Sequence, residues 1–186
     1  MNDTAESMTE LLGSAARGLS GERACILETL AKHRMLLRHT VDGLSESDAR
    51  RRPTASALTL AGILKHVEGV ERGWTDFIRT GVVEGAETWA DVAADPDAER
   101  EDFAVGPDDT CESLLARYAA TAARTDELVT TVDLDVAHKL PPAPWFPGEA
   151  WWSARQALAH IVGETAQHSG HADIIRETID GRRSMG

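Results

Sequence analysis

Four side chains that can bind a metal or carry a proton recur within "HIVGETAQHSGH", which runs from residue 160 to residue 171. His160, Glu164 and His168 are each four residues apart, and His171 follows three residues later. On a helix this spacing places all four side chains on one face, as a polar stripe. Apolar residues adjoin the stripe, and a buried ionisable group is costly without a partner. The pattern therefore indicates either a metal site or a solvent-exposed row of self-pairing side chains.

A second segment carries a histidine that could complete such a site. In "AGILKHVEGVERGW", His66 lies among apolar residues at helical spacing. If the two segments face each other in a bundle, His66 and two residues of the later segment make a three-ligand set with one open position. That arrangement is typical of catalytic zinc sites. The alternative for His66 is a core histidine satisfied by a hydrogen bond, and the same alternative applies to His33, which could line the same cavity.

Four long helical patterns must position these residues, and no convincing strand emerges. The patterns are residues 21–42, residues 59–80, a third that begins at "DTCE", and residues 153–181. Their predicted N-caps include Thr59, Asp109 and Ser153, and the last two each begin a capping box. Gly81 and Gly181 are predicted to end the second and fourth helices. We expect a single α-helical bundle.

Two long connections join the predicted helices. Residues 82–108 are acidic and contain Trp89, whereas residues 133–152 include "LPPAPWFPGEAWW". Loops of this length in a compact domain are usually functional or disordered. The bulky aromatics of the second loop favour an ordered lid between Trp145 and Trp152.

Composition and charge exclude several classes of protein. The chain has 186 residues and a formal net charge of −12, so we expect no nucleic-acid partner, which would need a basic patch. The basic run at residues 50–52 is interpreted as a solvated helix end. Two cysteines are too few for a disulfide framework, and neither a signal peptide nor a membrane span is recognisable. We expect a cytoplasmic protein with no membrane partner: a flexible segment at 1–19, one domain at 20–181 and a tail at 182–186.

The order of these features resembles the DinB-like metalloenzyme superfamily, and within it the mini-circle protein branch. That branch is related to mycothiol-dependent maleylpyruvate isomerase and to mycothiol S-transferases. Three stretches carry the resemblance: "LAKHRMLLRHTVDGLSESDARRRP", "TLAGILKHVEGVERGW" and "LAHIVGETAQHSGHADIIRETIDG". It implies an all-α, DinB/YfiT-like fold, a four-helix bundle of up-down-down-up order with a long crossover.

The resemblance also implies a divalent metal between the second and fourth helices, held by His66, Glu164 and His168. Many relatives have histidine in place of Glu164, and glutamate fits the isomerase-like and mini-circle branches. His160 matches a further family histidine beside the ligands, and His171 is either a fourth contact or a proton carrier. The relatives imply zinc, while iron and nickel are the alternatives that such ligands also hold.

The reaction that the resemblance implies is transfer of a thiol to an electrophile. An open zinc position lowers the pKa of a bound thiol, and because no cysteine lies near the ligands, a small-molecule cosubstrate such as mycothiol must supply it. The electrophile would bind beneath the lid, and Arg34 and Arg72 are either anchors for a polar substrate or ordinary surface arginines. The alternatives are a metal-dependent hydrolase or isomerase and a non-enzymatic metal-binding or stress-response protein. A homodimer is also expected.

Overall fold

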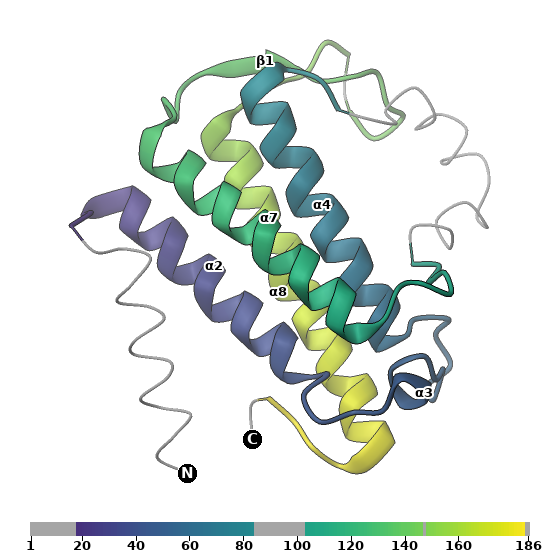
Figure 1. Ribbon diagram of the computed structural model, residues 1–186. Helices are drawn as coiled ribbons and strands as arrows, with labels where there is room; N and C mark the ends of the chain where they lie inside the picture. The colour runs from purple at the N-terminus through teal and green to yellow at the C-terminus, as the bar shows by residue number, and fades with distance from the viewer. Residues whose placement is uncertain (1–17, 84–102, 147, 185–186) are drawn as a thin grey trace.

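The computed structural model describes residues 18–83, 103–146 and 148–184. Its elements in chain order are α2 (Gly21–His39), α3 (Glu46–Ala49), α4 (Leu60–Thr80), α7 (Cys111–Thr131), β1 (Ala137–Lys139), β2 (Trp151–Ser153) and α8 (Ala154–Asp180). Helices α4 and α7 run in one direction, and α2 and α8 run in the other (Figure 1). The predicted all-α bundle of up-down-down-up order is confirmed. Trp89 and residues 1–17 lie outside the described residues.

Capping side chains begin and end the helices much as predicted. The Thr59 side chain accepts a hydrogen bond from the Gly62 amide at the start of α4, and Ser153 and Gln156 form the predicted capping box of α8. Gly81 and Gly181 end these two helices in the left-handed conformation, with φ of 74° and 78°.

Two predicted helix ends are wrong for local reasons. The N-cap of α7 is Thr110, whose side chain accepts from the Ser113 amide, because Asp109 is engaged in other hydrogen bonds. Helix α2 ends at His39 and not at residue 42. There the Thr40 hydroxyl and amide both donate to the Leu37 carbonyl, and such local bonds compete with the helical ladder.

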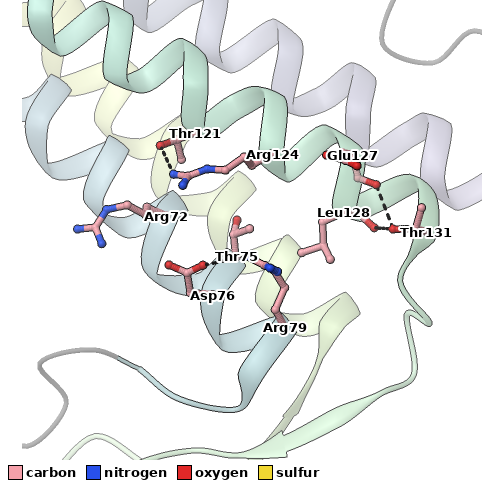
Figure 2. A pocket seen from close by; sticks show the side chains of 9 residues that line it. All are labelled: Arg72, Thr75, Asp76, Arg79, Thr121, Arg124, Glu127, Leu128 and Thr131. Carbon is pink, nitrogen blue, oxygen red and sulfur yellow. Dashed lines mark hydrogen bonds and ion pairs between the residues drawn. The ribbon is translucent and has the colours of Figure 1, made fainter.

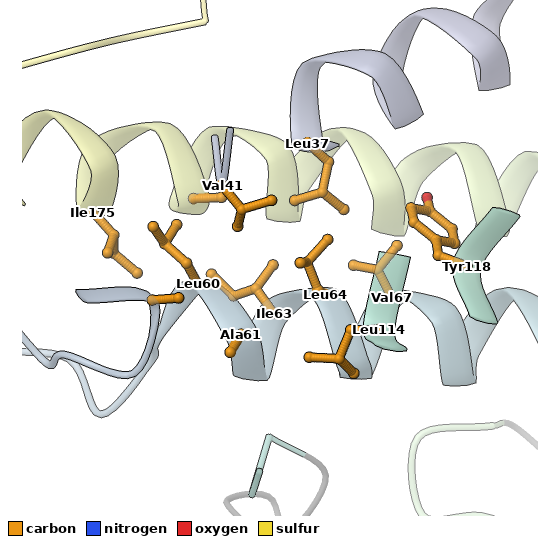
Figure 3. Close-up of a cluster of buried hydrophobic side chains, with 12 residues drawn as sticks. Leu37, Val41, Leu60, Ala61, Ile63, Leu64, Val67, Leu114, Tyr118 and Ile175 are labelled. Carbon is orange, nitrogen blue, oxygen red and sulfur yellow. The ribbon is translucent and has the colours of Figure 1, made fainter. Parts of the chain in front are cut away.

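The core consists of two apolar clusters separated by a polar layer. One cluster lies at the end of the bundle where α4 begins and includes Leu60 and Leu64 (Figure 3). The other includes Leu27 and Leu158 and lies at the opposite end. Between them each long helix contributes buried polar residues: Arg34, Glu71, Thr121, Thr125, Thr165 and Ser169. The centre of the bundle is therefore polar.

The loop that precedes α8 contains strands that the sequence pattern did not reveal. Strands β1 and β2 pair antiparallel, with Ala137 opposite Ser153 and Lys139 opposite Trp151. Each strand has three residues, which is too short for an alternating pattern to be recognised. The sequence pattern did not reveal these two strands, and the small sheet joins the predicted lid to the start of α8.

The basic run at residues 50–52 does more than end a helix. Arg51 and Arg52 are exposed, as predicted. Arg50 is half-buried, and its guanidinium donates to the carbonyls of Gly106 and Asp109, both at 2.9 Å. The interpretation as a wholly solvated helix end is therefore wrong for Arg50. No helix in the described part of the chain combines the length and apolarity that a membrane span requires.

Candidate metal centre

His66 on α4 meets Glu164 and His168 on α8. The Nε2 atoms of the two histidines lie 3.7 Å and 3.6 Å from the same Glu164 oxygen, Oε2. One ligand atom from each of the three residues lies within 4.8 Å of the others. The long helices thus bring together the three residues that the family resemblance implied, from positions about 100 residues apart.

These separations suit a shared ion better than direct pairing. A hydrogen bond between nitrogen and oxygen spans roughly 2.7–3.2 Å, so neither imidazole is hydrogen-bonded to Glu164 at the observed distances. Two ligand atoms that each lie about 2.1 Å from one tetrahedral ion are about 3.4 Å apart. Two imidazoles and one carboxylate also form a common zinc donor set with one position open. The residues present fit a divalent metal.

The protonation states favour metal binding as well. His168 is 8% exposed, and its pKa is lowered to about 4 by burial and by the neighbouring His66 imidazole, so at pH 7 it is neutral. The adjacent His66 imidazole holds the pKa of the Glu164 carboxyl below its usual value, although burial opposes the shift. At neutral pH the pair therefore offers a free nitrogen lone pair and a carboxylate.

His171 extends the site on the side of His168. The two imidazoles pack edge to face with ring centroids 5.2 Å apart. The Nδ1 atoms of both are buried and have no hydrogen-bond partner in the described structure. Buried polar atoms are normally satisfied, so a bound ligand or water belongs beside them.

His160 extends the site in the other direction, toward the predicted lid. Its Nε2 lies 3.8 Å from Oε1 of Glu164, whereas the other two histidines approach Oε2. The ring packs against Trp74 and Trp152, with centroids at 5.0 Å and 5.2 Å. Trp74 and Trp152 stack on each other at 4.8 Å. Trp152 therefore contacts His160 next to the proposed ligands, and its role in a lid stays a prediction.

Other predicted site residues lie farther from the cluster or are engaged elsewhere. Trp145 is 52% exposed, and its ring packs on Phe146 with centroids 6.3 Å apart. His33 is half-buried on α2, and its pKa is lowered by burial and by Lys32. Among the described residues, its ring makes none of the contacts that join His66, His168 and His171.

Arg34 is not a surface arginine, so that alternative is wrong for it. It is 6% exposed and pairs with Glu71, with Nε 3.1 Å from Oε2, and with Asp126 at 2.7 Å. Its guanidinium is thus occupied by two carboxylates. Arg72 is partly exposed and lies 3.6 Å from Glu68.

A pocket of about 310 Å³ lies between α4 and α7 (Figure 2). Its lining includes Arg72, Arg79 and Arg124 together with the acidic residues Asp76 and Glu127. None of the lining residues belongs to the cluster of His66, Glu164 and His168. Arg72 thus lines a pocket to which the proposed ligands do not contribute.

Phe103 is a site residue that the sequence patterns did not indicate. Its ring stacks on the His66 imidazole, with centroids 4.2 Å apart and an angle of 20° between the planes, and lies 5.6 Å from His168. Phe103 lies in the last part of the acidic crossover, residues 82–108, where no helical periodicity relates it to a face of the bundle. No signal in the sequence would have found it.

Comparisons with known proteins agree with this architecture. The sequence profile of the mycothiol-S-transferase family matches residues 25–181. A crystal structure described as a conserved protein from Enterococcus faecalis is similar, with a TM-score of 0.59 and 17% identity, and the match covers 88% of this chain and 99% of that one. At this identity it shows the fold alone. No curated protein was found to match. Because the family match covers most of the chain and includes His66, Glu164 and His168, the chain belongs to the mycothiol-S-transferase family.

Proposed function

We propose that this protein is a metal-dependent mycothiol S-transferase in which His66, Glu164 and His168 hold one divalent metal ion. The observation that carries the proposal is the approach of both imidazoles to one carboxylate oxygen, at 3.7 Å and 3.6 Å, in a member of this family. Three protein ligands leave a position for a substrate atom. Zinc is the metal we expect, and a homodimer stays a prediction.

The protein itself does not supply the reacting thiol. A divalent metal with an open position lowers the pKa of a thiol that reaches it, which makes a nucleophile at neutral pH. Cys25 is exposed on α2, and burial raises the pKa of the Cys111 thiol, with Glu46 adding to the shift. Neither cysteine belongs to the cluster of ligand atoms. A cosubstrate must therefore provide the sulfur, and the family indicates mycothiol.

The transfer forms a sulfur–carbon bond, and it breaks the S–H bond of the thiol and the bond from that carbon to its leaving group. The thiol sulfur bonds to an electrophilic carbon of the acceptor, the thiol proton is lost, and the leaving group departs from that carbon with its electron pair. His160 is the imidazole placed to accept the proton, because it lies beside Glu164 and faces the lid. The stacked rings of Trp74 and Trp152 form an apolar wall next to it. This wall favours an electrophile with an apolar body.

Cobalt substitution tests the proposal. Protein loaded with Co²⁺ should develop an intense charge-transfer band in the near ultraviolet when mycothiol is added, and a weaker band with glutathione. The His168→Ala variant should lose the band, since it removes a ligand. A variant with both Cys25→Ser and Cys111→Ser should keep it, which shows that the sulfur comes from the cosubstrate. An unchanged cobalt spectrum with every thiol tested would contradict S-transfer at this centre.

A further inference from the structure

We propose that Phe103 is a positioning residue for the metal centre: it holds the His66 imidazole in the orientation in which Nε2 faces Glu164. The residues that follow it, 103–109, are fastened to the bundle so that its ring stays in place. This inference rests on the proposed function, because it assumes that His66 binds a metal. It gives a role to the end of the long crossover.

The His66 ring needs an external constraint. The torsion that turns an imidazole about its Cβ–Cγ bond has a broad preference, so the packing around the ring sets its orientation. Histidine ligands are usually oriented by a hydrogen bond from their second ring nitrogen. The His66 Nε2 atom lies 3.7 Å from Glu164 Oε2, which is longer than an ordinary hydrogen bond. The nearly parallel stack with Phe103, at 4.2 Å and 20°, restrains the ring on one face, and the His168 ring packs against it edge to face at 4.7 Å.

Two cationic side chains fasten the 103–109 segment to the bundle. Lys65, the neighbour of His66 on α4, donates to the Ala104 carbonyl at 2.6 Å and to Asp109 Oδ2 at 3.0 Å. Arg50, which follows α3, donates to the carbonyls of Gly106 and Asp109. The segment is thus held at both ends.

Asp109 joins these contacts into one network. Its Oδ2 also accepts the Gly106 amide at 2.9 Å, which closes the segment on itself. Its Oδ1 lies 3.0 Å from the Arg117 guanidinium on α7. The Gly106 amide and Lys65 lower the pKa of this carboxyl to about 2, so the carboxylate persists at physiological pH.

Gly62 allows the segment to approach α4. A Cβ atom built at position 62 would lie 2.5 Å from the Phe103 carbonyl oxygen and 2.9 Å from Thr59 Oγ1. The carbonyl is a backbone atom and cannot rotate away. Gly62 precedes His66 by four residues, so both lie on one face of α4. The close approach and the ring stack therefore belong to the same contact surface.

Phe103 also packs against the apolar cluster near the start of α4, so its loss would lower stability in any case. Substitutions that separate ring stacking from apolar volume are needed. Phe103→Leu keeps an apolar side chain without a planar ring, whereas Phe103→Tyr keeps the ring. Gly62→Ala disturbs the contact between the 103–109 segment and α4. Gly69→Ala on the same helix is its matched control, because a Cβ at position 69 would meet nothing within 4 Å.

The test measures Zn²⁺ affinity by competition with a chelating dye, with the melting temperature of each metal-free variant measured in parallel. Loss of a group that orients a ligand typically weakens metal binding roughly 10- to 100-fold. We expect such a loss in Phe103→Leu and Gly62→Ala, and nearly wild-type affinity in Phe103→Tyr and Gly69→Ala. The visible spectrum of bound Co²⁺ should change in the first two variants, because the geometry around the ion changes.

Wild-type affinity and an unchanged cobalt spectrum in Phe103→Leu and Gly62→Ala would overturn the role of Phe103 and leave the proposed function standing. A wild-type protein that binds no divalent metal would overturn both, so the two failures are distinguishable. If Phe103→Leu does not fold, the comparison of Gly62→Ala with Gly69→Ala decides the matter alone.

Discussion

Single side chains at the centre of the bundle are placed by charge pairing as much as by apolar burial. Arg34 and Glu71 are the clearest case, because Glu71 is 0% exposed and both of its oxygens accept from the Arg34 guanidinium. The sequence contains a signal for this pair. Arg34 follows Leu30 by four residues and precedes Leu37 by three, within the apolar stripe of α2. A charged residue in such a stripe predicts a buried partner, which our interpretation of Arg34 as an anchor or a surface residue did not consider.

Removal of one partner of this pair should be costly. We expect Glu71→Ala to lower the free energy of unfolding by about 3–5 kcal/mol, because it leaves the Arg34 charge buried with only Asp126 beside it. The matched control is Asp76→Ala on the same helix, which breaks an exposed contact with Arg79 at 3.7 Å and should cost less than about 1 kcal/mol. Urea denaturation of both variants measures the difference. Equal losses of unfolding free energy in the two variants would show that the Arg34–Glu71 pair stabilises the bundle no more than an exposed ion pair does.

The residues of the proposed centre differ in how readily the sequence reveals them. Glu164 and His168 share a helical face by their spacing, and His66 shares a stripe with apolar neighbours, so the sequence and the family resemblance together predicted the group that the structure brings together. Phe103 could not be predicted, since its position depends on hydrogen bonds from Arg50 and Lys65 to backbone carbonyls. Backbone acceptors carry no residue-type signal.

At the scale of elements, glycines decide where neighbouring segments can meet. Gly81 ends α4 with φ of 74°, and a Cβ there would lie 2.8 Å from the His138 ring of β1. His138 in turn pairs with the Ile78 carbonyl at 3.1 Å. The end of α4 and the small sheet thus contact each other where a side chain at position 81 would not fit.

This contact predicts different costs for two similar substitutions. Gly81→Ala should destabilise the protein more than Gly181→Ala, although both glycines are left-handed and a side chain costs roughly 1–2 kcal/mol in that conformation. The reason is that a Cβ at Gly181 would meet nothing within 4 Å. Thermal unfolding of the two variants gives the comparison. Equal melting temperatures would mean that the sheet moves away from α4 at no cost.

The stability that the 103–109 segment contributes should depend on pH, because Asp109 titrates. Its pKa is lowered from 3.8 to about 2, so the ionised form stabilises the fold fully above pH 3.8, and this contribution is lost as the pH falls through about 2. The difference in unfolding free energy between wild type and Asp109→Asn should therefore be constant near neutral pH and shrink as the pH falls from about 4 toward 2. Urea denaturation at a series of pH values checks this. A difference that does not change over this range would show that the ionised Asp109 carboxylate does not stabilise the fold.

At the scale of the whole molecule, the bundle carries its own core, so a metal would not be required for folding. The two apolar clusters draw on all four long helices, unlike a zinc finger, which is unfolded without its metal. The helical periodicity made the bundle predictable. The polar layer had a partial signal in the sequence, the charged Arg34 within an apolar stripe. The small sheet was not predictable, because strands of three residues are too short for an alternating pattern.

Metal removal should therefore affect stability and not structure. We expect a chelator to leave the far-ultraviolet circular dichroism spectrum nearly unchanged while it lowers the melting temperature, since a ligand that binds only the folded state stabilises that state. Added Zn²⁺ should restore the original melting temperature. Collapse to an unfolded spectrum would instead indicate a structural metal, and an unchanged melting temperature would indicate that no metal had been bound.

Metal analysis of protein purified without a histidine tag and without chelator tests the central claim most directly. We expect a stoichiometric divalent metal in the wild type and in His39→Ala, a control that removes a histidine of α2 outside the cluster. We expect loss of that metal in His66→Ala, Glu164→Ala and His168→Ala, provided that each retains the helical spectrum of the wild type. Loss of a direct ligand should weaken metal binding at least as much as loss of a residue that orients a ligand, which weakens it roughly 10- to 100-fold. Full metal content in all three variants would contradict the assignment of this centre.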